Sequence, residues 1–185
     1  MTLNEIKLGG FGGQGIILSG IIIGRAAAIY DNKHATLTQS FGPEARGSAC
    51  SASVVISDEP ITYPYVLRPD ILVVMSQDAY NRFRPELKPE GLLLYESELV
   101  HFDGSRAAGR RFGIPATRLA EEVGRRLVLN IVMVGFFAAM TDVVRAEAIR
   151  QSVEVSVPAG TEALNLAAFQ KGYDHGLQLG PQARA

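Results

Sequence analysis

Two segments near the N-terminus, residues 35–41 and 49–57, alternate apolar or small side chains with polar ones. This period of two is typical of half-buried strands, because successive side chains of a strand point to opposite faces of the sheet. The connection between the segments, residues 42–48, is too short for the crossover that parallel strands require. The sequence therefore predicts an antiparallel pair.

The remaining apolar segments predict more strands and several helices. Short apolar runs bounded by polar or turn residues are typical of buried strands, and longer runs with helical periodicity are typical of helices. Strands are predicted over residues 3–10, 70–76 and 91–97, with a weaker one over 110–116. Helices are predicted over residues 14–30, 77–83, 117–127, 130–140, 145–153 and 161–177. In the segment 14–30, apolar side chains nearly encircle the helix, so we expect it to be largely buried.

Strands and helices that alternate in this way predict an α/β fold. The antiparallel pair makes the sheet mixed, although most of its strands are expected to be parallel. We predict a single three-layer domain over residues 1–178, followed by a flexible tail over 179–185. Its first strand leads into the first helix through a glycine-rich turn.

That turn, within "KLGGFGGQGIILSG", is the first candidate site, and its proposed binding residues are Gly10, Gly12, Gly13, Gln14 and Gly15. Glycines allow the backbone to approach a ligand closely, and the free N–H groups at a helix start attract an anion. An NAD site should also offer an acidic residue at the end of the second strand, but "HATLTQSF" contains none. Two further interpretations stay open: a site for another phosphate, or a turn that serves only tight packing.

The loop between the antiparallel strands, "GPEARGS" at residues 42–48, is the second candidate site. Glu44 and Arg46 can be solvated charges of an ordinary turn. However, the strand that follows begins with small residues, 48–53, and so offers a flat polar face that another molecule can approach closely. An arginine beside glycines can bind a carboxylate or a phosphate through two parallel hydrogen bonds. We therefore predict that Glu44 and Arg46 contact a substrate or a partner.

Composition limits the function further. The 185 residues carry a net charge of −1, which argues against a nucleic-acid-binding protein. No apolar stretch reaches the roughly 20 residues that a membrane-spanning helix needs. The single cysteine, Cys50, excludes an internal disulfide and favours a cytoplasmic location. An iron–sulfur cluster takes about four protein ligands, so this chain cannot hold one alone, and we predict no metal site.

Four blocks of sequence together resemble a known family, and they follow one another in the same order over nearly the whole chain. They are "GGFGGQGI", "TQSFGPEARGSACSASVVISDEPITYPYV", "DILVVMSQDAYNRF" and "NIVMVGFFAA". They are similar to the gamma subunit of 2-oxoacid:ferredoxin oxidoreductases, and most similar to the gamma subunits of the 2-oxoglutarate enzymes. One departure is Ser48, where the family often has glycine in "GPEARGG".

The resemblance implies a role within a larger enzyme. Such enzymes decarboxylate a 2-oxoacid on thiamine diphosphate, pass two electrons through iron–sulfur clusters to ferredoxin, and release an acyl-coenzyme A. Thiamine diphosphate, Mg and the clusters would lie on partner alpha, beta or delta subunits. The gamma chain, inactive alone, would help to form the coenzyme A region and the assembly interface. Two alternatives remain: an autonomous nucleotide-binding protein and a purely structural assembly subunit.

Overall fold

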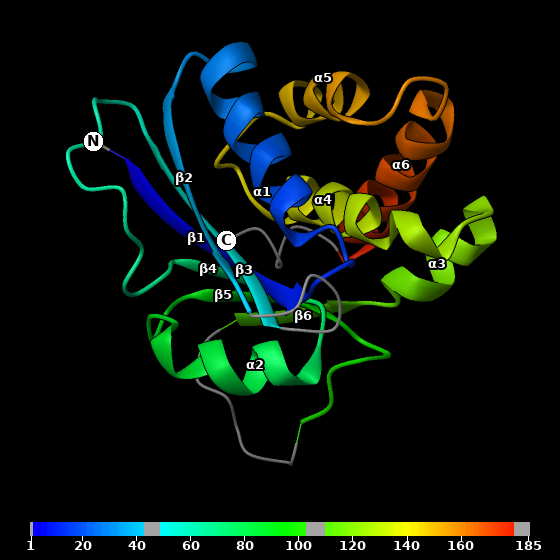
Figure 1. The fold of residues 1–185 in the computed structure, drawn as a ribbon, viewed down its shortest axis with the longest axis horizontal. Helices are drawn as coiled ribbons and strands as arrows, with labels where there is room; N and C mark the ends of the chain where they lie inside the picture. The colour runs from blue at the N-terminus through cyan, green and yellow to red at the C-terminus, as the bar shows by residue number, and fades with distance from the viewer. Residues whose placement is uncertain (1, 43–48, 103–109, 180–185) are drawn as a thin grey trace.

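A computed structural model describes residues 2–42, 49–102 and 110–179. Its centre is a six-stranded sheet with the strand order β2-β3-β1-β4-β5-β6 (Figure 1). Strand β3 is antiparallel to both of its neighbours, whereas β1, β4, β5 and β6 are parallel to one another. The strands are β1 (Leu3–Phe11), β2 (His34–Phe41), β3 (Ala49–Ser57), β4 (Ile71–Val74), β5 (Leu92–Glu96) and β6 (Arg110–Ile114).

The helices form two layers of unequal thickness. Helix α2 (Gln77–Phe83) lies on one face of the sheet, and the other helices lie on the opposite face (Figure 1). Three-layer α/β architecture with a mixed, mostly parallel sheet is thereby confirmed. The helices of the thick layer are α1 (Ile16–Arg25), α3 (Ala116–Val123), α4 (Leu129–Met140), α5 (Ala146–Ser156) and α6 (Glu162–Gln178).

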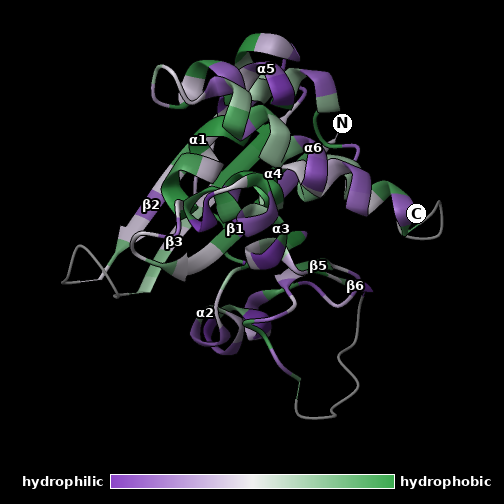
Figure 2. Ribbon diagram, turned by 90° about the vertical axis from the view of Figure 1, so that its right-hand side faces the viewer, coloured by the Kyte–Doolittle hydropathy of each residue, from purple (hydrophilic) through white to green (hydrophobic). Residues whose placement is uncertain are grey.

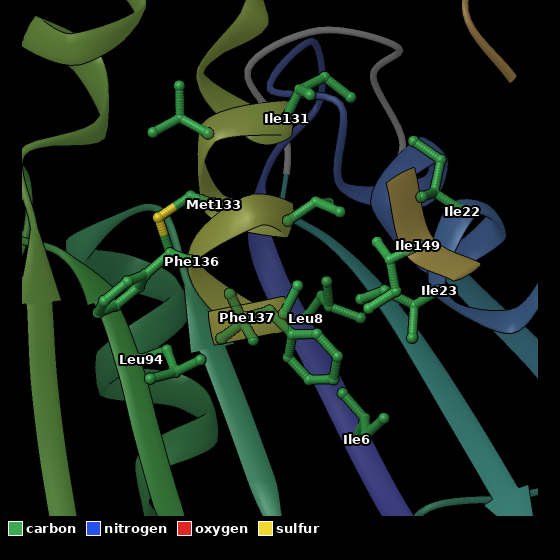
Figure 3. Packing of buried hydrophobic residues seen from close by; sticks show 14 of the residues in the cluster. Ile6, Leu8, Ile22, Ile23, Leu94, Ile131, Met133, Phe136, Phe137 and Ile149 are labelled. Atoms are coloured by element: carbon green, nitrogen blue, oxygen red, sulfur yellow. The ribbon is translucent and has the colours of Figure 1, made fainter. Parts of the chain in front are cut away.

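Alternation along the central strands supplies apolar side chains to both layers. In β4, Ile71 and Val73 belong to the main core beneath the thick layer, while Leu72 and Val74 pack towards α2. The main core places Ile6 and Leu8 of β1 against Phe137 of α4 (Figure 3). Colouring by hydropathy shows α1 and α4 largely hydrophobic and α2 largely hydrophilic (Figure 2).

Helices α4 and α6 cross with their backbones in contact. A Cβ at Gly135 would overlap the carbonyl oxygen of Phe169, and a Cβ at Gly172 would overlap that of Val132. Glycine at both positions therefore permits a closer approach than any other residue would. Every residue of α4 is buried, which agrees with its almost uniformly apolar sequence.

The helix predicted over residues 14–30 differs in detail from the prediction. Helix α1 begins at Ile16, and its final part, Ala26–Tyr30, widens into a π-helix. The segment is also less buried than expected, since Ile21 is only partly buried and Ile29 is exposed. These two side chains lie beside the edge strand β2, where no further strand of the described chain covers them.

Two further expectations concern the ends of elements and the membrane. The segment predicted as a helix over 117–127 is α3 followed by a short 3₁₀ turn, Arg126–Val128. The tail predicted from residue 179 lies almost wholly outside the described residues and stays a prediction. Among the described residues, no helix has the length and apolar character needed to cross a bilayer.

Candidate functional site

The glycine turn lies where β1 ends and α1 begins, at the carboxyl edge of the parallel strands. In open α/β sheets, ligands bind at this edge, beside the point where the strand order changes direction. Here β3 lies beside β1 on one side and β4 lies beside it on the other, so the strand order changes direction at β1. The fold therefore puts the turn in the position that ligand-binding turns occupy.

The glycines of the turn serve different purposes. A Cβ at Gly10 would lie 2.6 Å from both Oε1 of Gln14 and Cδ1 of Ile16, so a side chain here would displace both of them and this glycine serves packing. Gly13 has φ +96° and nothing within 4 Å of the place where a Cβ would stand. Its backbone conformation favours glycine, and the space in front of it is open. Gly13 is thus the position of the turn that a ligand can reach most directly.

Gly15 is held from several sides. It is the N-cap of α1, with φ +74°, and a Cβ there would overlap the side chain of Asn130. Its carbonyl oxygen accepts hydrogen bonds from the amide of Ser19 (3.0 Å), the hydroxyl of Ser19 (3.1 Å) and Nδ2 of Asn130 (3.4 Å). The start of α1 is consequently fixed against α4.

The side chain of Gln14 folds back into the turn. Its Oε1 accepts a hydrogen bond from the amide of Phe11 (2.7 Å), and its Nε2 donates one to the carbonyl of Met75 (2.8 Å). Met75 follows β4, so Gln14 ties the turn to the neighbouring strand. Both polar groups of this side chain are used within the chain, and its contribution to a site is to shape the backbone.

The electrostatics of the turn favour an anion. Helix α1 has neither a side-chain cap nor an acidic residue in its first turn, and the same is true of α4, whose start carries Asn130. The first four N–H groups of a helix have no partner within the helix and carry partial positive charge. The start of α1 therefore leaves this charge uncompensated by its own residues, whereas the 3₁₀ turn before α4 already accepts the amide of Leu129 at the carbonyl of Arg126.

Sequence reasoning missed Asn130. This residue is 4% exposed, at the start of a helix that is otherwise apolar, and such a buried amide needs hydrogen-bond partners. A single amide side chain among the apolar residues of "LNIVMVGFFAAM" was the signal in the sequence that could have identified it. Its partner could not be found in the sequence, because Gly15 is 115 residues away.

The second predicted site cannot be placed in the same way. Glu44 and Arg46 lie outside the described residues, and their contact with a substrate or partner stays a prediction. The strands on either side are described, and they form the predicted antiparallel pair, with Phe41 opposite Cys50. The amide of Gly42 donates to the carbonyl of Ala49 (2.9 Å), which closes the ladder before the loop.

Cys50 and the acidic residues offer little to a metal. Burial raises the pKa of the Cys50 thiol, so the thiolate that binds metals or attacks substrates is disfavoured. Among residues 2–42, 49–102 and 110–179, no three His, Cys, Asp or Glu side chains gather in a group that could hold a metal ion.

Comparison with known proteins identifies the class to which this fold and turn belong. The family model described as pyruvate ferredoxin/flavodoxin oxidoreductase matches residues 5–175. The chain belongs to this family.

Individual relatives agree with that assignment. The chain is 50% identical to 2-oxoglutarate synthase subunit KorC of Methanocaldococcus jannaschii, over 95% of each chain. It is also similar to the crystal structure of a keto/oxoacid ferredoxin oxidoreductase gamma subunit from Geobacter sulfurreducens PCA. In that match the TM-score is 0.84 and the identity 39%, over 95% of this chain and 99% of the other. The predicted resemblance to gamma subunits is confirmed.

A more distant structure shares the fold. The 2-oxoglutarate:ferredoxin oxidoreductase of Magnetococcus marinus, solved with 2-oxoglutarate, coenzyme A and succinyl-CoA bound, matches with a TM-score of 0.86 at 22% identity. The match covers 97% of this chain but 32% of that one, so the same fold occurs there within a longer polypeptide.

Proposed function

We propose that the chain is the gamma subunit of a 2-oxoacid:ferredoxin oxidoreductase that uses 2-oxoglutarate. The observation that carries this proposal is the 50% identity to a 2-oxoglutarate synthase subunit over nearly the full length of both chains. The enzyme would convert 2-oxoglutarate and coenzyme A to an acyl-coenzyme A and carbon dioxide, and pass the two electrons that are released to ferredoxin. The subunit would contribute to this reaction only within the cytoplasmic complex.

The electron-transfer and thiamine chemistry would belong to the partner alpha, beta or delta subunits. A cluster needs about four thiolates, whereas this chain has one cysteine, which is buried. The role left to the chain is to bind and position, which suits the open glycine turn. An anionic group of coenzyme A, a phosphate, would lie against the backbone in front of Gly13 at the start of α1.

A second candidate function is supported by Gly10 and Gly15. Both are glycine for reasons of packing, as the overlaps of a Cβ with Gln14 and Asn130 show. The turn could be glycine-rich for this reason alone, in a subunit that serves only assembly. Gly13 distinguishes the two functions, because it has open space in front of it.

The complex tests the overall proposal. The tagged chain should co-purify with thiamine-binding and cluster-binding subunits when all are produced together. The purified complex should reduce ferredoxin with 2-oxoglutarate only when coenzyme A is present, and much more slowly with pyruvate. A chain that purifies alone, or a complex that prefers pyruvate, would contradict it.

Two substitutions of Gly13 test the coenzyme A site. Asn and Asp tolerate positive φ better than other side chains and have nearly the same shape, so Gly13→Asn and Gly13→Asp differ mainly in one negative charge. In the assembled enzyme, Gly13→Asp should raise the KM for coenzyme A about tenfold above that of Gly13→Asn. This corresponds to roughly 1.4 kcal/mol of repulsion. The KM for 2-oxoglutarate should be equal in the two variants. Equal KM values for coenzyme A would assign the turn to packing.

A further inference from the structure

A groove lies on the face of the sheet that carries α2, beyond the end of that helix. It has a volume of about 570 Å³, and residues of β1, β2, β3, α2 and the segment 58–70 line it. On the opposite face of the same strands, Ala52 and Val54 pack into the main core beneath α1. The groove is therefore a surface feature on the back of a well-packed sheet.

The floor of the groove is made of short hydroxyl side chains from two neighbouring strands. In the register of β2 and β3, Thr38 is opposite Ser53 and Ser40 is opposite Ser51. Ser51 and Ser53 are buried at the bottom, whereas Ser40 is exposed. Side chains this short keep the floor flat, so another backbone can come close to the sheet.

One wall of the groove is aromatic. Tyr63 and Tyr65 come from the segment 58–70 and meet edge to face, with 5.5 Å between their ring centroids. Each is 57% exposed, and Leu67 beside them is 67% exposed, while Val66 is buried and anchors the segment. Large apolar groups gathered at an exposed groove are a usual sign of an interaction surface.

The other wall carries positive charge. Lys7 is largely buried. Its Nζ lies 4.8 Å from the centroid of the Phe83 ring and forms an ion pair with Glu86. Arg82 of α2 is exposed, and no carboxylate of residues 2–42, 49–102 or 110–179 forms an ion pair with it. The described residues that line the groove include Lys7 and Arg82 but no Asp or Glu. Arg82 is thus the cation that an incoming carboxylate would meet.

We propose that this groove is a docking site for an acidic segment of a partner subunit of the same enzyme. Exposed tyrosines and an arginine around a close-packed centre are the composition of the strongest positions in protein interfaces. The segment's carboxylate would pair with Arg82, and its backbone would lie over the serine floor between Arg82 and the tyrosines. The inference rests on the proposed function, since it requires that the chain has partner subunits.

Assembly of the complex from purified subunits tests the groove. Arg82→Glu and Tyr65→Ser should each weaken the binding of the partner subunits at least about tenfold, as measured by titration and gel filtration. The control is Arg150→Glu on α5, a partly exposed arginine on the opposite face of the molecule that pairs with Glu147, and this variant should bind like the wild type. Because Arg82 and Tyr65 are exposed, the isolated variants should melt within a few degrees of the wild-type chain.

The salt dependence of assembly provides a second test of the docking site. Raising the salt concentration from about 0.1 M to about 0.5 M should weaken assembly of the wild type, because it screens the attraction between Arg82 and the acidic segment. The same increase in salt should weaken the assembly of Arg82→Glu less, or strengthen it, because in this variant salt screens the repulsion between the introduced carboxylate and the acidic segment. An identical salt response in the two proteins would overturn the assignment of an acidic partner to Arg82.

The outcomes separate this inference from the proposed function. If the wild-type chain does not assemble with any partner, the proposed function fails and the docking site fails with it. If the wild type assembles and both variants assemble equally well, only the docking site is overturned. A variant that assembles normally but has a raised KM for coenzyme A or 2-oxoglutarate would show a small-ligand groove, which also overturns it.

Discussion

The two faces of the sheet differ in what covers them and in what they leave exposed. On one face of the described sheet, five helices bury a continuous core that includes Ile6, Leu8 and most of α4. On the other face, the short helix α2 covers a smaller cluster around Phe83, beside a polar groove lined by serine, tyrosine and arginine. The thick layer supplies most of the free energy of folding, because burial of apolar surface is its main source. The thin layer leaves sheet surface accessible to other molecules.

The glycine turn lies at the edge between these layers. Asn130 reaches it from the thick layer, and Gln14 ties it to the carbonyl of Met75 at the end of β4. Its backbone is thus held by the rigid side of the molecule, while Gly13 remains open. A binding element built in this way needs little rearrangement when its ligand arrives.

Truncating one phenylalanine in each layer should give the largest effect and measure the difference directly. Phe136 is 0% exposed in the thick layer, and Phe83 is 5% exposed in the thin one. We expect Phe136→Ala to lower the free energy of unfolding by about 4–5 kcal/mol and Phe83→Ala by about 3 kcal/mol, because the thinner layer can collapse into the space. Urea denaturation of the isolated chain measures both. Equal losses would show that the two layers contribute alike to the core.

The crossing of α4 and α6 gives the next prediction. Gly135→Ala should lower the free energy of unfolding by about 3 kcal/mol, because the new methyl group would overlap the backbone of α6. Gly24→Ala is the matched control in the same layer. There the nearest atom to an added Cβ is 3.8 Å away, so we expect stabilisation of about 0.5–1 kcal/mol from helix propensity. If Gly135→Ala also stabilised the chain, the close helix crossing would be wrong.

Much of this fold was predictable, and the reasons are local. Several strands of the sheet are either continuously apolar, as in Ile71–Val74, or cleanly alternating, as in 49–57, and both patterns depend only on neighbouring residues. The antiparallel pairing of β2 and β3 followed from the length of their connection. The position of β3 between β2 and β1 was not predictable in this way, because β1 precedes β2 in the chain.

The candidate site was predictable only in part. Consecutive glycines between a strand and a helix indicated the turn, and the short polar side chains after residue 47 indicated a surface that can be approached closely. The roles of Gln14 and Asn130 depend on residues 61 and 115 positions away in the sequence. The tyrosine wall depends on how the segment 58–70 returns across the sheet. Contacts between such distant residues leave no periodic signal.

A smaller effect comes from the ion pair that joins the end of the π-helix to the start of α5. The guanidinium and amide of Arg145 both donate to the carboxylate of Asp31, and Nη2 of Arg145 donates to the carbonyl of Tyr30 (2.6 Å). Burial alone would raise the pKa of Asp31, but the hydrogen bonds and charge of Arg145 outweigh it, and the pKa is lowered below 3.8. Arg145→Ala should therefore cost about 1–2 kcal/mol near neutral pH.

The pH dependence of this loss of stability follows from the direction in which the pKa of Asp31 is shifted. A pKa that is lowered in the folded state stabilises the protein at pH values above the pKa of the unfolded state. This contribution disappears as the pH falls through the pKa of the folded state. The difference between wild type and Arg145→Ala should therefore be constant above about pH 5 and should shrink below about pH 4. A difference that stayed constant down to about pH 2 would mean that the ion pair does not stabilise the fold.

Hydrogen exchange tests the division between the two faces most directly. The amides of the isolated chain and of the chain within its assembled complex would be compared, segment by segment. We predict that exchange in the segment 58–70 slows strongly on assembly, whereas α4, already buried, and α6, which packs one face against it, exchange at nearly the same rates in both states. If exchange slowed in α4 and α6 but stayed unchanged in 58–70, the assignment of the thick layer to folding and the thin layer to assembly would be contradicted.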